Sequence, residues 1–315
     1  MARWLTRLVA LNDGWAGPLG EFNQRWVQAV FRRLGPIKDL LHGRWLGHPL
    51  HSASTDLPIG LLLGSVILDV LGQPAAADIV LIASILTMVL AALSGLADYA
   101  DTGGTARTRA TLHSTLMTVA LVVLILSAVL RAGGHDDRTI PIVMSIVAFL
   151  LVSAGAYVGG DVVYALGNMV SRHAFRGPGT KWIRLDTGQL GDLAALPENS
   201  PVKARAGTND IVLVRSGGSL QAMHAVCAHA GGPMDQGRLV DGCLECPWHG
   251  SRFRLSDGLV QRGPSVYDQP SYELRTAADG GYEVRRRDPL RETTAEPEPV
   301  PTRERARAEG PVPRS

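Results

Sequence analysis

Two short motifs combine cysteine and histidine, the side chains that most readily bind transition metals. Cys227 and His229 are separated by one residue, Cys246 and His249 by two, and sixteen residues lie between the motifs. Alternate side chains of an extended segment point the same way, with origins about 6.6 Å apart, so Cys227 and His229 can reach two neighbouring metal atoms. A cluster of two iron atoms fits this spacing better than a single ion.

A zinc site made of two cysteines and two histidines is the alternative. Such sites usually pair two cysteines at Cys-x2-4-Cys spacing and two histidines at His-x3-5-His spacing. Each motif here holds one cysteine and one histidine instead, which favours the two-iron cluster.

The two motifs resemble those of the Rieske proteins, in which two histidines replace two cysteines on one iron of a [2Fe-2S] cluster. The resemblance implies that Cys227 and Cys246 bind one iron, and that His229 and His249 bind the other. With two thiolates and two neutral imidazoles the oxidised cluster is neutral, so it accepts an electron more easily than an all-cysteine cluster.

The surroundings of the motifs depart from one branch of the family. High-potential Rieske proteins have a disulfide across the two loops, and the matching positions here are Gly232 and Trp248. Ser251 matches the serine that bonds a cluster sulfur in those proteins, and Phe253 stands where they often have tyrosine. Gly250 is expected to let backbone amides approach the cluster. Alternatively, Ser251 caps a turn and faces solvent, so the reduction potential stays open.

The composition separates two unlike halves. Residues 57–160 are mostly apolar, whereas residues 181–315 are soluble in character. The net charge is only +2, and neither a Lys/Arg-rich run nor an aromatic RNA-binding motif occurs, so no nucleic-acid partner is expected. Cys243 has no obvious pair, which predicts a buried apolar role and gives no argument for an oxidising compartment.

Four apolar segments follow the N-terminal region, and each is close to the roughly 20 residues that a bilayer requires. They are residues 57–72, 79–97, 112–130 and 140–159. The first is short and contains Asp69, so three spanning helices and one re-entrant segment are the alternative. The predicted fold is an α-helical membrane bundle of four transmembrane helices, followed by a small all-β Rieske domain.

Positive charge in the loops predicts the orientation. The side shared by the N-terminal arm, the second loop and the C-terminal flank has Lys38, Arg44, Arg107, Arg109, Arg172, Arg176, Lys181 and Arg184. The loops of the other side hold only Arg131 and Arg138. We therefore expect a multi-pass protein of the cell membrane, in contact with the lipid bilayer, with both termini and the Rieske domain in the cytoplasm.

Five regions are expected along the chain. They are an amphipathic basic N-terminal arm (1–46), the four-helix membrane domain (47–170), a linker (171–181), the Rieske domain (182–288) and a disordered tail (289–315). Residues 21–34 of the arm read as an amphipathic helix, which either lies in the membrane interface or packs on the membrane domain.

The membrane half has a polar cluster of its own. It consists of His48, His51, Asp56, Asp98 and His113. Two histidines from different helices at equal depth could bind haem or another metal. Alternatively, His48 and His51 cap a helix or pair with Asp98 and Asp101 at a wet helix end.

Residues 48–51 and 56–60 resemble an uncharacterised family of four-helix bacterial membrane domains. This resemblance implies that such a domain is present and implies no activity.

These patterns favour a membrane-anchored electron-transfer protein over a complete enzyme, with a redox donor and acceptor that the sequence does not identify. Rieske-type oxygenases need a large additional domain with a mononuclear iron, and we do not expect one in residues 289–315. Two alternatives stay open: a quinone- or haem-linked membrane oxidoreductase with a second redox site in the membrane half, and a redox sensor or scaffold.

Overall fold

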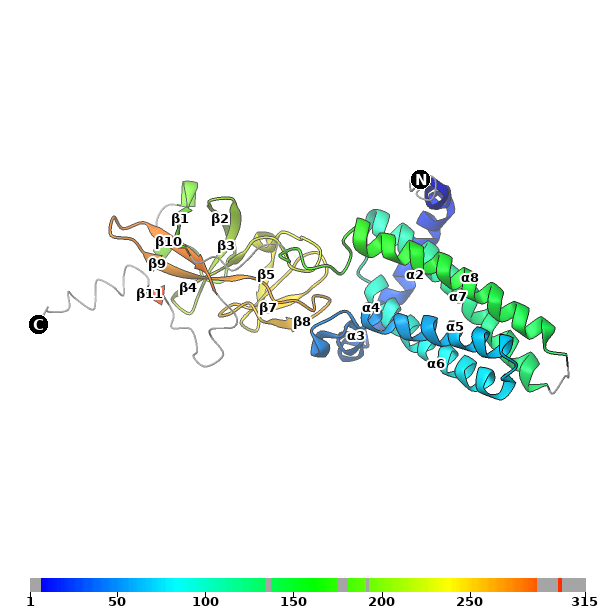
Figure 1. Ribbon diagram of the computed structural model, residues 1–315. Helices are drawn as coiled ribbons and strands as arrows, with labels where there is room; N and C mark the ends of the chain where they lie inside the picture. Colours follow the sequence, from blue (N-terminus) through cyan, green and yellow to red (C-terminus); the bar gives the residue numbers. More distant parts are fainter. Residues whose placement is uncertain (1–6, 134–136, 175–180, 191–192, 288–299, 302–315) are drawn as a thin grey trace, which may run out of the picture. The chain divides into compact units, whose positions relative to one another are not determined.

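A computed structural model describes residues 7–133, 137–174, 181–190, 193–287 and 300–301. The chain divides into two compact units, Met1–Met169 and Val170–Ser315. The first, here the helical unit, contains the long helices, and the second, here the β unit, contains the strands (Figure 1). The two are described separately below.

Four helices of the helical unit are long and apolar enough to cross a membrane. The helices of the described residues are α2 (Asp13–Phe31), α3 (Gly35–His42), α4 (Leu50–Ser54), α5 (Asp56–Val70), α6 (Pro74–Tyr99), α7 (Gly104–Ala132) and α8 (Thr139–Gly160). Helix α4 runs into α5, which gives the first candidate span 21 residues, and a π-helical turn, Asp161–Ala165, extends α8. The predicted four-helix bundle followed by a small β domain is confirmed.

The bundle has an apolar interior and an apolar exterior. Leu62, Leu81 and Leu124 are buried at its centre, while Leu86 and Leu150 lie on the outer surface, more than half exposed. A water-soluble helix would present polar residues on that outer face. The apolar outer surface therefore suits a lipid environment.

A buried ion pair joins the first and third of the long helices. Arg131 of α7 lies 2.6 Å from Asp69 of α5 and 2.9 Å from Asp78 of α6, and the Arg131 and Asp69 side chains are almost fully buried. Because an unpaired charge is costly in such a place, the pairing explains how an apolar helix accommodates Asp69.

Helix α2 packs on the helical unit through its small and polar face. Gln24 is buried and donates to the Thr102 carbonyl at 2.6 Å, and the Tyr99 hydroxyl donates to the Gly20 carbonyl at 3.0 Å. Phe22 and Trp26 lie on the exposed side, about two-thirds exposed. The helix thus packs on the unit, and its large aromatic residues remain on the outer surface.

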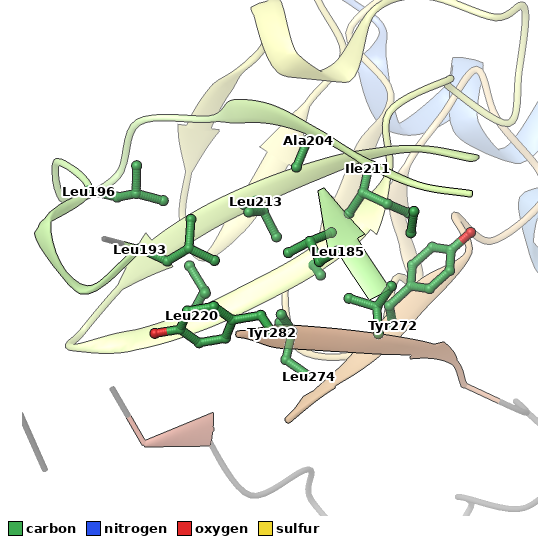
Figure 2. Close-up of a cluster of buried hydrophobic side chains, with 13 residues drawn as sticks. Leu185, Leu193, Leu196, Ala204, Ile211, Leu213, Leu220, Tyr272, Leu274 and Tyr282 are labelled. Carbon is green, nitrogen blue, oxygen red and sulfur yellow. The ribbon is translucent and has the colours of Figure 1, made fainter. Parts of the chain in front are cut away.

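The β unit contains a closed barrel. Its strands are β1 (Ile183–Asp186), β2 (Val202–Ala206), β3 (Asn209–Ser216), β4 (Ser219–His224), β9 (Ser271–Thr276) and β10 (Tyr282–Arg286). They follow the order β4-β3-β2-β1-β10-β9, and the pairing of β4 with β9 closes the sheet. Figure 2 shows leucines and tyrosines from these strands gathered in one cluster, together with Leu193 and Leu196.

A second, four-stranded sheet carries the metal-binding motifs. It consists of β5 (Arg238–Val240), β6 (Cys243–Glu245), β7 (Arg252–Arg254) and β8 (Val260–Arg262), paired in that order. One motif lies between β4 and β5, and the other lies between β6 and β7. Phe253 and Leu244 are fully buried in the core beneath them.

The structure describes the expected linker and the expected tail only in part. Of the expected linker, residues 175–180 lie outside the description, while Arg172 donates its backbone N–H to the Ala228 carbonyl at 3.1 Å and so packs within the β unit. Of the expected tail, only Val300–Pro301 is described, as β11 beside β4. The first six residues of the N-terminal arm also lie outside the description.

Candidate metal centre

The first motif lies in a loop that folds back on its cysteine. The Cys227 N–H donates to the Gly232 carbonyl at 2.9 Å, and the Gly231 N–H donates to the Cys227 carbonyl at 3.0 Å. Gly231 has a φ of +84°, a conformation that glycine adopts without a steric penalty. These bonds close a tight turn around the Cys227 side chain.

The second motif repeats this arrangement bond for bond. The Cys246 N–H donates to the Ser251 carbonyl at 2.9 Å, and the Gly250 N–H donates to the Cys246 carbonyl at 3.1 Å, with Gly250 at a φ of +74°. The two loops are therefore structural equivalents, and each presents one cysteine and one histidine.

The two cysteines are buried and hydrogen-bonded to one another. This hydrogen bond lowers the pKa of Cys246 to about 7 against the effect of burial, and the backbone N–H groups of Trp248 and His249 act in the same direction. The N–H groups of His229 and Ala230 lie in the same way around Cys227. The same hydrogen bond, together with burial, raises the pKa of Cys227, so Cys246 is the cysteine that this pair favours as a thiolate, the form that binds metal.

The two histidines of the site lie side by side and differ in exposure. Their ring centroids are 5.1 Å apart and the ring planes are almost perpendicular. His229 is buried, His249 is half-buried, and Trp248 beside it is 57% exposed. One edge of the centre, at His249 and Trp248, therefore reaches the surface, whereas His229 and both cysteines are buried.

Gly232 and Trp248 occupy the positions where high-potential relatives have a disulfide, and here they are in close contact. A Cβ atom on Gly232 would lie 2.8 Å from the Cys246 sulfur and 3.1 Å from Cγ of Trp248. Real contacts at a Cβ are almost never that short, so only glycine fits. All three cysteines, Cys227, Cys243 and Cys246, are free.

Ser251 is fully buried, so the alternative of a solvent-facing serine is wrong. Its carbonyl accepts the bond from Cys246, and its hydroxyl oxygen accepts the Ser265 N–H at 3.0 Å. Because this contact uses a lone pair, the hydroxyl hydrogen can still be donated. Ser251 is thus part of the second loop's framework.

Two further residues hold the first loop, and the motifs do not reveal them. The buried Gln269 side chain donates to the Val226 carbonyl at 2.8 Å and accepts the Ala228 N–H at 2.8 Å. The ring of His173 also contacts the Val226 carbonyl, at 2.8 Å. Both residues lie outside the cysteine-histidine pattern, and only the fold brings them to the loop.

The arrangement fits a [2Fe-2S] cluster better than one ion. Within the described ranges, no group of three or more histidine, cysteine, aspartate or glutamate side chains is placed to hold a single metal ion. The four side chains instead form a cysteine pair and a histidine pair, one for each iron. Cys227, Cys246, His229 and His249 would hold the cluster, and its chemistry is the uptake and release of single electrons.

The predicted polar cluster of the helical unit is only partly brought together. His51 and His113 lie beside one another, with ring centroids 6.0 Å apart. Asp98 pairs instead with His42, at 2.9 Å, a buried histidine absent from the predicted set. His48 and Asp56 are exposed. The predicted alternative paired Asp98 and Asp101 with His48 and His51, whereas the structure pairs both aspartates with His42.

Comparisons with known proteins agree with this centre. Residues 188–273 match the model of the Rieske [2Fe-2S] domain. The chain is 33% identical over 95 residues to the anthranilate 1,2-dioxygenase ferredoxin subunit of Burkholderia cepacia, which covers 30% of this chain and 87% of that protein. It is 26% identical over 102 residues to the cytochrome b6-f complex iron-sulfur subunit of Chlorobaculum thiosulfatiphilum, covering 32% of this chain and 55% of that one.

Among solved structures, the ferredoxin of carbazole 1,9a-dioxygenase from Nocardioides aromaticivorans aligns with a TM-score of 0.30 and 23% identity, over 34% of this chain and 100% of that one. The β barrel, the paired loops and the sequence match together define an iron-sulfur protein. The chain belongs to the Rieske [2Fe-2S] family, and its β unit is the Rieske domain.

Proposed function

We propose that the protein is a membrane-anchored electron carrier, which passes single electrons between a donor and an oxidoreductase partner. The observation that carries this proposal is the exposure of the second motif at His249 and Trp248. His249 and the exposed Trp248 place one edge of the centre at the surface, where a partner protein can approach it. The cysteine side lies in the core, out of reach of water.

The loops also suit a carrier that changes charge by one unit. Backbone N–H groups are fixed dipoles that point at the two sulfurs. They stabilise negative charge without rearranging, so little reorganisation accompanies the arrival of an electron. The ferredoxin and iron-sulfur subunits that the chain resembles support the same role.

The helical unit supplies the anchor in this proposal. Its four long apolar helices are long enough for a bilayer, and their outer faces are apolar. The excess of lysine and arginine on the flanks shared by the two ends favours a cytoplasmic position for both termini and for the Rieske domain.

Membranes from cells that express the full chain provide the test. We expect the protein in the membrane fraction, with a paramagnetic signal of the reduced cluster that appears when a respiratory substrate is added and disappears on oxidation. Fused after Ser315, a reporter that works in the cytoplasm should be active, and one that works only in the periplasm should be inactive. A cluster that changes oxidation state with dithionite but with no cellular donor would contradict the carrier role and favour the sensor or scaffold.

A further inference from the structure

The helical unit is built from two equivalent helix pairs. The first pair consists of α4–α5 and α6, and the second consists of α7 and α8. In the first, His51 precedes Ser65 by fourteen residues, and in the second, His113 precedes Ser127 by the same interval. Each serine hydroxyl donates to a carbonyl near the start of the next helix: Ser65 to Ala77 at 2.9 Å, and Ser127 to Pro141 at 2.7 Å.

The two histidines occupy equivalent positions in this repeat. His51 Nδ1 lies 2.8 Å from the Ala91 carbonyl of α6, and His113 Nδ1 lies 2.8 Å from the Gly155 carbonyl of α8. The sequence separations are 40 and 42 residues, and those of the serine bonds are 12 and 14. Both intervals are two residues longer in the second pair, so the difference lies in the connection between its helices. The pairs therefore correspond helix to helix.

A glycine lies against each imidazole. A Cβ atom on Gly95 would be 2.9 Å from Cε1 of His51, and one on Gly159 would be 2.9 Å from Nδ1 of His113. Each glycine is four residues, about one helical turn, beyond the carbonyl that the ring contacts. Both rings thus lie against a backbone position where only glycine fits.

The hydrogen bonds fix the tautomer of both rings. A carbonyl oxygen only accepts, so each Nδ1 carries the hydrogen and each Nε2 keeps its lone pair. Within the described part of the helical unit, neither Nε2 has a hydrogen-bond partner. An Nδ1–H bonded to a backbone carbonyl is the arrangement that metal-binding histidines adopt.

The separation of the rings suits two ligands on opposite sides of one metal. A metal–nitrogen bond of about 2.0 Å and about 1.1 Å from nitrogen to ring centre place two such centroids about 6 Å apart. The observed distance is 6.0 Å, with the ring planes at 76°. Rotation of one ring about the metal–nitrogen axis leaves this distance unchanged.

We propose that His51 and His113 are the two axial ligands of a haem iron in the helical unit. Two imidazoles are too few for a simple ion, which takes four or more ligands, and no third metal-binding side chain joins them among the described residues. A haem supplies the other four nitrogen ligands itself and needs only two from the protein.

The test uses the full chain, purified in detergent from cells supplied with a haem precursor. We expect about one haem and about three iron atoms per chain, against about two iron atoms for the [2Fe-2S] cluster alone. His51→Ala and His113→Ala should each lose the haem and keep the paramagnetic signal of the cluster. His48→Ala, an exposed histidine of the same segment, is the matched control and should keep both.

A second variant separates ligation from folding. His113→Met replaces one nitrogen ligand with a thioether, so haem should stay bound with an altered spectrum and a higher reduction potential. Wild-type protein with about two iron atoms and no haem would overturn the proposal and leave the two rings in a simple edge-to-face contact. So would haem that persists in both alanine variants. Neither result would contradict the electron-carrier proposal, because the paramagnetic signal of the cluster is measured independently of the haem.

Discussion

Opposite kinds of backbone group contact the cysteines of the Rieske domain and the histidines of the helical unit. In the loops, the N–H groups of residues 229–230 and 248–249 point at the cysteine sulfurs. In the bundle, the carbonyls of Ala91 and Gly155 point at the imidazoles of His51 and His113. The difference follows from secondary structure, because helical N–H groups are already bonded within the helix.

This contrast determines which ligand suits each region. A loop with free N–H groups stabilises anionic sulfur, so it suits thiolates and a cluster that becomes more negative on reduction. A helix offers an acceptor, which orients a neutral histidine and leaves its other nitrogen ready for a metal. Both regions use two equivalent segments, and each segment supplies half of the site.

The largest expected effect is the loss of the cluster from the Rieske domain without any change in the helical unit. Cys246→Ser should abolish the cluster, because a serine hydroxyl is a far weaker iron ligand than a thiolate at neutral pH. Optical and paramagnetic resonance spectra of the purified protein measure this loss. The helical content, read by circular dichroism, should stay unchanged, because the cysteine lies in the other unit.

Cys243→Ala is the matched control for that change. Cys243 is also buried, but it lies on β6, outside both loops, and its sulfur makes a long contact with the Asp241 carbonyl at 3.7 Å. A full cluster is expected in this variant. If Cys243→Ala removed the cluster as completely as Cys246→Ser, the assignment of the cysteine ligands would be wrong.

A smaller effect is expected at His42, which tests the helical unit alone. Burial lowers the pKa of His42, but hydrogen bonds with Asp101 and Asp98 outweigh it and raise the pKa to about 9. A raised pKa stabilises the folded state fully below about pH 6.5, and this contribution disappears as the pH rises to about 9. The shift corresponds to about 3 kcal/mol in the free energy of unfolding.

Thermal unfolding of the full chain in detergent, followed at several pH values, measures this loss. Lys38 also contacts Asp101, at 2.7 Å, and is present in every protein compared. His42→Gln should remove the pH dependence between about 6.5 and 9, whereas His48→Gln should leave it intact, because His48 is exposed. Equal pH dependence in all three proteins would show that folding does not raise the pKa of His42.

The sequence reveals the loop site more completely than the bundle site because of how each is encoded. The cluster ligands lie within 227–249, so their spacing is visible in one local pattern. The longer strands β3, β4 and β10 each begin after a glycine-containing turn, which is a local signal of the sequence. The three-residue strands β5 to β8 carry too few residues for a pattern.

The bundle site depends on distant partners instead. His51 and His113 were predicted, but His42 was missed because its partners Asp98 and Asp101 are more than fifty residues away. Gln269 was missed for the same reason, since it reaches the first loop only through the closed barrel. The spacing of His51 and Ser65, repeated at His113 and Ser127, is a signal that could have revealed the paired architecture.

The smallest expected effect is a change in the reduction potential of the cluster when Ser251 is replaced. Its hydroxyl oxygen accepts the Ser265 N–H, which turns the hydroxyl hydrogen away from that partner. The family resemblance places a cluster sulfur nearby, and a donor stabilises the reduced, more negative cluster more than the oxidised one. Ser251→Ala should therefore lower the reduction potential and leave assembly intact.

The size of this shift is limited by how much the hydrogen bond strengthens on reduction. A hydrogen bond to a charged group contributes about 1.5 to 3 kcal/mol, and only the part gained with the added electron changes the potential. A gain of about 1.4 kcal/mol corresponds to about 59 mV for one electron.

Ser265→Ala is the matched control, since it removes a buried hydroxyl that donates to the Tyr267 carbonyl and keeps the backbone N–H to Ser251. Redox titration of the three proteins at one pH should lower the midpoint only in Ser251→Ala. An unchanged midpoint with a full cluster would mean that Ser251 supports the loop without bonding the cluster.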